Sequence, residues 1–116
     1  MGIRILELKK GYSKLDMVIT EDMINFHNVA HGGAIFALSD AAFAAAGNSH
    51  GQVSVALCMS INYRSPANKG MRLMAECFEE SLGRRTALYR IEVRSEDGTL
   101  IALSQGTVYR KEEELT

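Results

Sequence analysis

The sequence predicts an α+β domain in which one long helix lies against an antiparallel sheet of five or six strands. The chain has 116 residues, which is enough for one hydrophobic core but not for two, so we expect one domain over residues 1–116. An alanine-rich run in the first half predicts the helix. Apolar and polar residues alternate before and after that run, which is the pattern of strands that bury one face.

Two short strands and the helix are expected in the first half of the chain. Residues 15–20 alternate as a strand does, and residues 3–8 can pair with them through a turn at Lys10-Gly11. The helix is predicted over residues 29–48, with Gly47 near its end as a stop signal. Its apolar residues nearly encircle the axis, so we expect the helix to be buried and wrapped by the sheet.

Four strands are expected after the helix, over residues 53–65, 72–82, 86–94 and 99–110. Pro66 ends the first run, and Gly83 joins the second run to the third as a hairpin. Asp97-Gly98 favours a type I′ turn between the last two strands, because this turn needs positive φ at both central residues. We therefore predict a four-stranded meander, followed by a frayed tail over residues 111–116.

Composition excludes several classes of protein. Hydrophobic residues make up 47% and charged residues 23% of the chain, and the formal net charge is −1. These values are typical of a globular domain, and the spread of charges leaves no basic stripe for nucleic acid. The N-terminus has no apolar signal core and no apolar stretch suits a membrane span, so we expect a cytoplasmic protein. Cys58 and Cys77 lack the spacing of a zinc site, and we expect two buried thiols.

Asp40 is the most unusual residue of the predicted helix. A carboxylate among alanine, leucine and phenylalanine side chains loses its hydration at a large cost unless it is paired or faces a cavity. Two explanations stay open from the helix alone. Either Asp40 faces a wet groove or caps a neighbouring loop, or it is a functional carboxylate.

The start of the same helix carries a second candidate feature, His31-Gly32-Gly33. Free N–H groups at a helix start can hold a developing oxyanion, and glycines let a carbonyl approach the backbone. The alternative is that the two glycines only permit a sharp start of the helix. Asp40 lies eight residues after Gly32, or about 12 Å along the helix axis. One carbonyl cannot contact both in one chain, so a site that uses both requires the antiparallel helices of a two-fold dimer.

Three residues before the helix could donate a side-chain hydrogen bond to the same carbonyl, namely Asn25, His27 and Asn28. The sequence does not separate them, and each could instead order the loop or cap the helix. His31 is either a general base or a residue whose side chain hydrogen-bonds to nearby backbone.

The run from Asn25 to Ala44, with His31-Gly32-Gly33 and Asp40 at this spacing, resembles the signature of PaaI-type hotdog thioesterases. Residues 62–67, residues 83–86 and the final strands are also similar, so the resemblance covers about residues 15–110. It implies a hotdog fold, dimers joined through continuous sheets, and frequently tetramers that are dimers of such dimers. It implies no metal and no cofactor, because CoA is part of the substrate.

The resemblance also implies roles for three residues. Asp40 would activate water or attack the thioester of a small aryl- or acyl-CoA. The Gly32 N–H and the Asn25 side chain would polarise the thioester carbonyl from the neighbouring subunit. In related enzymes a Ser or Thr on the following strand assists the carboxylate, whereas Ala56 occupies that place here. We therefore expect Asp40 to act without a hydroxyl helper.

The expected substrate-binding residues are His31, Gly33, Arg64, Arg84 and Arg85. The three arginines lie near strand ends, as does Lys69, and the phosphates of CoA need cationic partners. Each of these four cations could equally be a solvated surface charge.

Two other functions stay open. The chain could be a non-catalytic acyl-CoA-binding module, since one fold hosts several functions. It could also be a hotdog dehydratase or hydratase, which needs an acid/base pair that faces the substrate. His31 lies nine residues before Asp40, about 180° around the helix, so one chain cannot supply both members of such a pair. The sequence leaves the acyl group open.

Overall fold

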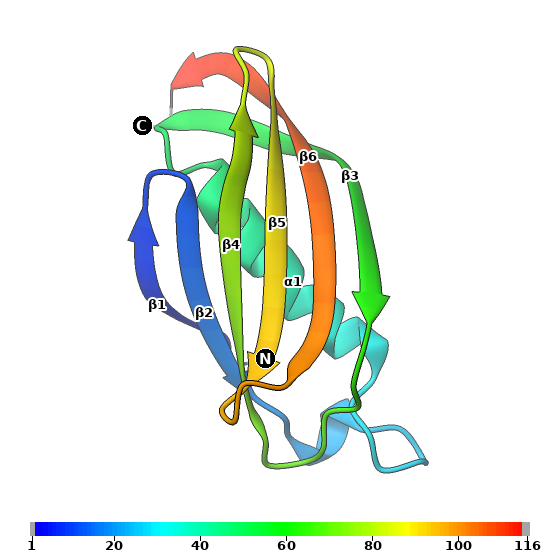
Figure 1. Cartoon of the computed structure of the whole chain (residues 1–116). Helices are drawn as coiled ribbons and strands as arrows, with labels where there is room; N and C mark the ends of the chain where they lie inside the picture. Colours follow the sequence, from blue (N-terminus) through cyan, green and yellow to red (C-terminus); the bar gives the residue numbers. More distant parts are fainter. Residues whose placement is uncertain (1, 115–116) are drawn as a thin grey trace.

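A computed structural model describes residues 2–114 as one helix and a six-stranded antiparallel sheet that curves around it (Figure 1). In chain order the elements are β1 (Arg4–Lys9), β2 (Tyr12–Val18), the 3-10 turn η1 (Glu21–Met23), α1 (Gly32–Gly47), β3 (Gln52–Tyr63), β4 (Arg72–Leu82), β5 (Thr86–Ser95) and β6 (Leu100–Glu114). The strand order in the sheet is β1-β2-β4-β5-β6-β3. Within these residues no helix is long and apolar enough to cross a membrane.

The core lies between α1 and the concave face of the sheet. Phe43 of α1 is 1% exposed, and its ring meets Tyr89 of β5 edge-on with 5.9 Å between the ring centroids. Gly106 of β6 lies directly over the Phe43 ring, since a Cβ built at Gly106 would stand 2.6 Å from Cζ of Phe43. The absence of a side chain at Gly106 therefore lets β6 approach the helix closely, which holds α1 in place.

The helix begins three residues later than predicted. Val29 bridges to Asn68 and Ala30 to Ile24, so both residues are extended, and His31 precedes the helix with φ −59° and ψ 139°. Asn28 has φ 63°, a left-handed conformation that Asn tolerates better than most residues. The alanine content predicted a longer helix. These backbone bridges instead hold residues 29–31 in the extended segment that precedes the helix.

The sheet wraps α1 as predicted, but within the single chain it covers only one side of the helix. One face of α1 is buried against the sheet, and the opposite face is open between the edge strands β1 and β3. The exposed residues on that open face are Gly33, Phe36, Asp40 and Ala44. The sheet curves over one side of the helix only, so the apolar residues on the other side have no cover within the chain.

The predicted four-stranded meander is wrong in its strand order. Strands β4, β5 and β6 do form a meander, but β4 pairs with β2 on its other side, as in the register Leu15↔Ala75. Strand β3 instead lies at the far edge of the sheet, where Ile61 pairs with Ser104 of β6. Alternation of apolar residues fixes which face of a strand is buried but not which strand lies beside it.

The ends of β5 and β6 also differ from the predictions. Only Gly98 of the Asp97-Gly98 pair has positive φ, so the turn is not type I′. Ser95 N–H donates to Thr99 and Gly98 N–H donates to Ser95, which makes a three-residue loop with glycine in the left-handed position. Strand β6 continues to Glu114 by pairing with β3, whereas the sequence predicted that residues 111–114 are frayed. The last two residues of that predicted tail lie outside the described residues.

Candidate active site

The N-terminal turn of α1 presents free N–H groups next to β3. The first residues of an α-helix have no intrahelical acceptor, and no other acceptor within residues 2–114 takes the N–H of Gly32 or Gly33. Tyr63 of β3 lies on Gly32, because its hydroxyl donates to the Gly32 carbonyl at 3.0 Å. A Cβ at Gly32 would stand 3.0 Å from Cζ of Tyr63, whereas a Cβ at Gly33 would meet nothing within 4 Å. Packing within the chain therefore explains the glycine at position 32 but not the one at position 33.

The loop before α1 fixes the side chain of Asn25. Its Oδ1 accepts hydrogen bonds from the backbone N–H groups of His27 at 2.9 Å and Val29 at 3.4 Å. The backbone N–H of Asn25 also donates to Val29, at 2.9 Å. These contacts use the acceptor of the Asn25 amide and leave its Nδ2 able to donate, since no acceptor in the described part of the chain takes it.

The other two candidates in this loop are oriented differently. The His27 ring packs against the Phe26 ring in a tilted arrangement, with 4.9 Å between the ring centroids, and Phe26 is 94% exposed. Asn28 is exposed, and its backbone adopts the left-handed conformation with which the chain turns in this loop. The His31 side chain is exposed and makes no capping hydrogen bond to the helix, and within residues 2–114 it does not form the backbone hydrogen bond that was one of its two possible roles.

Asp40 is exposed in the single chain, on the open face of α1. The sequence left open whether Asp40 faces a wet groove or caps a loop, or is a functional carboxylate, and Asp40 is exposed in one chain because the sheet does not cover that face of α1. Phe36, Ala37 and Ala44 are its neighbours one turn away on the helix. Among the described residues, none donates a hydrogen bond to Asp40 or forms an ion pair with it. Asp40 is therefore a carboxylate on a small apolar surface, without a partner among the residues that the structure describes.

One chain does not bring Asp40 and Gly32 together. Both residues lie on α1, which puts them eight residues or about 12 Å apart along the axis. The structure therefore keeps the separation that the sequence predicted.

A groove of about 380 Å³ lies beside the start of α1 and includes one of the predicted arginines. Its lining residues are Ala30, Gly32, Ile35, Tyr63, Arg64, Ser65, Pro66 and Ala67. Arg64 thus lies in the same groove as Gly32. Lys69 does not contribute to this groove, because its ammonium pairs with Glu21 at 2.5 Å on the surface.

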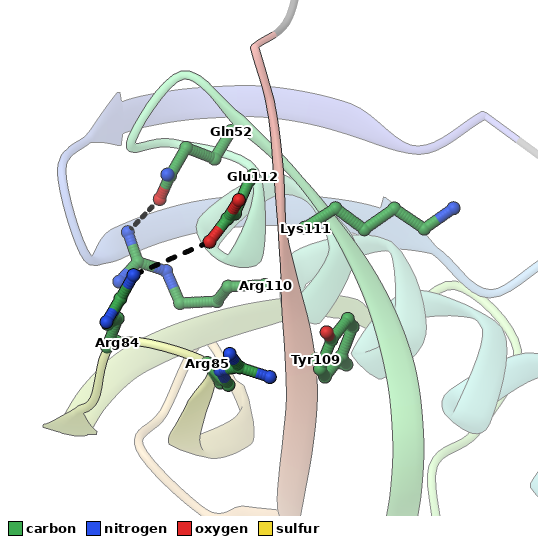
Figure 2. A pocket seen from close by; sticks show the side chains of 7 residues that line it. All are labelled: Gln52, Arg84, Arg85, Tyr109, Arg110, Lys111 and Glu112. Atoms are coloured by element: carbon green, nitrogen blue, oxygen red, sulfur yellow. Dashed lines mark hydrogen bonds and ion pairs between the residues drawn. The ribbon is translucent and has the colours of Figure 1, made fainter.

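Arg84 and Arg85 lie at the other end of the molecule, in a second cavity of about 680 Å³ (Figure 2). Its lining residues are Gln52, Arg84, Arg85, Tyr109, Arg110, Lys111 and Glu112. Gln52, Arg110 and Lys111 were not predicted from the sequence as site residues. The adjacent cations Arg110 and Lys111 could have indicated this cavity. The sequence pattern instead placed Arg110 at the end of the last predicted strand and Lys111 in the predicted frayed tail.

The curved sheet around one helix and the loop that precedes that helix define the class of protein. The chain matches the thioesterase superfamily over residues 27–102 and belongs to this family. Its fold is the hotdog fold, as the resemblance implied, and its class is that of a thioester hydrolase.

Similarities to individual proteins support this family assignment. The acyl-coenzyme A thioesterase PaaI of Escherichia coli K12 is 34% identical over 110 residues, which are 95% of this chain and 79% of that protein. A protein of Archaeoglobus fulgidus, named for an inferred esterase activity, is 50% identical over 98% of this chain and 74% of its own length. The solved structure of the E. coli PaaI protein from the phenylacetic acid degradation operon superposes with a TM-score of 0.96 at 34% identity, over 99% of this chain and 83% of that one. The TT0310 protein of Thermus thermophilus gives a TM-score of 0.91 at 44% identity, over 95% of this chain and 92% of that one.

Proposed function

We propose that the protein hydrolyses a small aryl- or acyl-CoA thioester to the free acid and CoA, at a site that two copies of the chain share. The observation that carries this proposal is the position of Asp40. It is an unpaired carboxylate on an open apolar face, about 12 Å along one helix from the N–H group that would polarise a carbonyl. A second α1 that runs antiparallel beside the first would cover that face and bring its Gly32 next to Asp40.

The composition and exposure of strand β3 also favour a two-fold partner on this side of the molecule. Its sequence, QVSVALCMSINY, contains no charged residue and no proline, although it forms an edge of the sheet. Val55 is 41% exposed, Leu57 59% and Tyr63 50%. Natural edge strands are usually protected by charges, proline or a covering element. An edge without these features favours pairing with a second β3, which would continue the sheet across the dimer.

The mechanism assigns one step to each group. The Asp40 carboxylate removes a proton from a water molecule while the water oxygen attacks the thioester carbon. The carbonyl oxygen gains the negative charge and accepts hydrogen bonds from Gly32 N–H and from Nδ2 of Asn25 of the other copy. Collapse of this intermediate breaks the carbon–sulfur bond, and the CoA thiolate leaves and takes up the proton. Asn25 is preferred over His27 and Asn28 as the donor because its Oδ1 is already occupied, which directs Nδ2 away from the loop.

The relatives and the groove support a CoA thioester as the substrate class. The E. coli relative is named an acyl-coenzyme A thioesterase and covers most of this chain. Arg64 lies in the groove with Gly32 and would contact the substrate there, together with Gly33 and His31 at the helix start. Phe36 on the open face of α1 would supply an apolar wall for the acyl group. Strand β3 carries Ala56 where relatives place a helper hydroxyl, so Asp40 acts alone as the base.

The first test compares thiol release from a panel of aryl- and acyl-CoA esters by wild type, Asp40→Ala and Glu96→Ala. Glu96 is an exposed carboxylate away from the site and serves as the matched control. We expect kcat to fall at least about a hundredfold for Asp40→Ala, the usual effect of removing a general base, and to stay unchanged for Glu96→Ala. If wild type binds acyl-CoA but releases no thiol from any ester, the protein is a binding module and the catalytic proposal fails.

A mixed dimer tests whether the site is shared. We would co-express Asp40→Ala and Asn25→Ala chains with different tags and purify the species that carries both. If the two residues come from different copies, one of the two sites contains neither substitution and the mixed dimer regains about half of the wild-type activity. If both residues act within one chain, every site is damaged and the mixed dimer shows only the mean of the two parents.

A further inference from the structure

The end of β3 lies beside the first turn of α1 (Figure 1), and the side chain of Tyr63 joins the two. We propose that Tyr63 is a positioning residue, whose hydroxyl fixes the backbone of Gly32 so that the Gly32 N–H points at the carbonyl of the thioester. This inference rests on the proposed hydrolysis of CoA thioesters. It gives a role to a residue that the mechanism above does not use.

The first turn of α1 lacks the features that usually order a helix start. His31 precedes the helix, and its side chain makes no capping hydrogen bond. Gly32 and Gly33 follow, and glycine loses more conformational freedom on folding than any other residue. An oxyanion site nevertheless needs N–H groups that are already aimed before the charge develops. Some other contact must therefore order this turn.

Tyr63 supplies such a contact from outside the helix. Its hydroxyl donates to the Gly32 carbonyl at 3.0 Å, and its ring packs on the same residue, since a Cβ at Gly32 would stand 3.0 Å from Cζ of Tyr63. A usual capping side chain accepts a hydrogen bond from an N–H group of the first turn. Tyr63 instead acts on a carbonyl, so it orders the turn and leaves the N–H groups free for a substrate.

The hydrogen bond from Tyr63 completes the fixing of Gly32 on both sides. The peptide group before Gly32 carries its N–H, and the carbonyl of that group, which belongs to His31, accepts a hydrogen bond from Ala34 N–H at 3.1 Å. The peptide group after Gly32 carries the carbonyl that Tyr63 holds. Each peptide group is planar, so only the two dihedral angles of Gly32 can turn one plane relative to the other. Holding both planes therefore holds the direction of the Gly32 N–H.

Backbone hydrogen bonds keep the two sides of this contact in place. At the end of β3, Arg64 N–H donates to the Ile101 carbonyl at 2.8 Å. The segment that leads into α1 is tied to the segment after β3, because Ala30 N–H donates to the Ala67 carbonyl at 2.7 Å. The hydroxyl thus joins two backbones that are already ordered, so little further entropy is lost when its hydrogen bond forms.

The geometry makes Tyr63 a positioning residue and not a catalytic one. A phenol has one proton to donate, and Tyr63 donates it to the Gly32 carbonyl. Tyr63 also lines the groove that contains Gly32, and its side chain is half exposed in the single chain. A substrate in this groove would displace water from the contact, and a hydrogen bond is electrostatically stronger where water is excluded. The hydroxyl therefore orders Gly32 most strongly when the thioester is bound.

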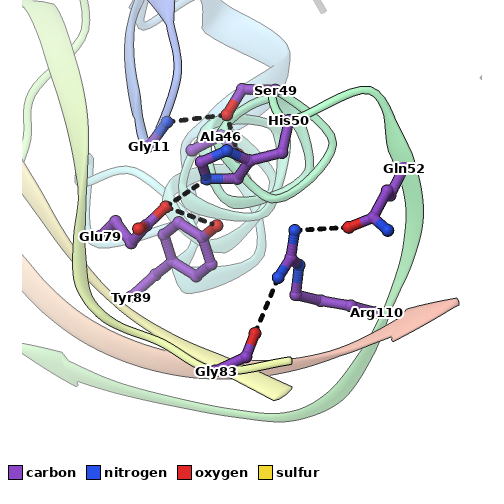
Figure 3. Close-up of polar contacts among 9 residues, drawn as sticks. All are labelled: Gly11, Ala46, Ser49, His50, Gln52, Glu79, Gly83, Tyr89 and Arg110. Carbon is purple, nitrogen blue, oxygen red and sulfur yellow. Dashed lines mark hydrogen bonds and ion pairs between the residues drawn. The ribbon is translucent and has the colours of Figure 1, made fainter. Parts of the chain in front are cut away.

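A separate set of contacts fixes the other end of α1 and provides a matched control (Figure 3). Just after the helix, the Ser49 hydroxyl accepts a hydrogen bond from Gly11 N–H at 2.8 Å. The Glu79 carboxylate lies 2.5 Å from Nε2 of His50 and accepts a hydrogen bond from the Tyr89 hydroxyl at 3.4 Å. The last residue of α1 is about 22 Å along the axis from the first. Tyr89→Phe therefore removes a bound tyrosine hydroxyl far from the oxyanion donors.

The first experiment compares kcat and KM of wild type, Tyr63→Phe and Tyr89→Phe for one aryl-CoA ester. Phenylalanine keeps the ring of Tyr63 on Gly32 and removes only the hydroxyl. We expect kcat of Tyr63→Phe to fall about tenfold, less than the roughly hundredfold loss on removing an oxyanion donor itself, and its KM to stay within about twofold of wild type. Tyr89→Phe should keep both values. An unchanged kcat in Tyr63→Phe, or an equal fall in both variants, would overturn the proposal.

The carbonyl of a bound thioester reports the oxyanion donors directly, without turnover. Benzoyl-CoA with an isotopic label at the carbonyl carbon is bound to Asp40→Ala, to Asp40→Ala/Tyr63→Phe and to Asp40→Ala/Tyr89→Phe, and its stretching frequency is measured by infrared difference spectroscopy. Hydrogen bonds to the carbonyl lower this frequency. We expect the lowering in Asp40→Ala to be kept with Tyr89→Phe and to become clearly smaller with Tyr63→Phe.

The same spectra separate the inference from the proposed function. If the carbonyl frequency is lowered equally in all three proteins, Tyr63 does not position the donors, while the proposed site stands. If the frequency of bound benzoyl-CoA is not lowered even in Asp40→Ala, the proposed oxyanion donors are wrong, and the role of Tyr63 fails with them.

Discussion

Replacement of Gly33 by alanine should separate the stability of the chain from its activity. Gly33 has ordinary helical φ at an exposed position in the first turn of α1, and a Cβ built there meets nothing within 4 Å. Alanine in a helix is favoured over glycine by roughly 0.5–1 kcal/mol. The Gly33→Ala variant should therefore keep its stability or gain up to roughly 1 kcal/mol, which is a rise in Tm of a few degrees.

Activity should change in the opposite direction. In the proposed site the new methyl group lies where a thioester carbonyl approaches the helix start, and a displacement of about 1 Å can reduce the rate by about a hundredfold. Thermal unfolding and kcat/KM for one acyl-CoA, measured on the same preparation, test both effects. Gly32→Ala is the comparison, because its Cβ would stand 3.0 Å from the Tyr63 ring and force that ring to shift, which should lower both stability and activity. A Gly33→Ala protein that is fully active would refute the proposed approach of the substrate.

Three further predictions concern the rest of the chain. Asp16 is 1% exposed and accepts two hydrogen bonds from Arg4, which lower the pKa of its carboxyl group. The Asp16 carboxylate therefore stabilises the fold above pH about 4, and this stabilisation is lost as the pH falls through the lowered pKa. Asp16→Asn should cost about 1–3 kcal/mol at pH 7 in urea unfolding and should make stability less dependent on pH in acid. Burial raises the pKa of the Cys77 thiol to about 12, whereas Cys58 is exposed, so a thiol reagent at pH 8 should label Cys58 in the native protein and Cys77 only after unfolding. Gly106→Ala should destabilise the fold by about 1–3 kcal/mol, because its Cβ would stand 2.6 Å from a buried ring; unchanged urea midpoints for both stability variants would contradict these contacts.

The sequence predicted the elements well because their periodic patterns are long. Strand β4 has the predicted bounds, and α1 differs from the prediction mainly at its start. Strand order could not be predicted, because the pattern of β3 is the same whether it pairs with β4 or with β6. Cys58 illustrates the same limit, since its strand was predicted correctly but the expectation of a buried thiol was wrong.

The candidate site could be predicted only where it is continuous in sequence. Gly32 and Asp40 lie on one helix, so their spacing alone predicted that a site that uses both needs two helices, whereas Asn25 was distinguished from His27 and Asn28 only by the resemblance. The cationic cavity depends instead on long-range pairing, since Gln52 and Arg110 are 58 positions apart and meet only through the register of β3 and β6. The sequence left the exposure of Asp40 open, because it depends on which side of the helix the sheet leaves uncovered.

The uncharged β3 edge has a consequence for handling the protein in solution. An isolated subunit would present a row of unpaired N–H and C=O groups on a strand with exposed Val55 and Leu57, which is a template for pairing with any extended chain. If the protein assembles through β3 as proposed, dilution that separates its subunits should therefore promote aggregation instead of leaving a clean monomer. The solubility of this protein would then depend on its own assembly, and inactivation by heat would become irreversible as soon as the edges separate.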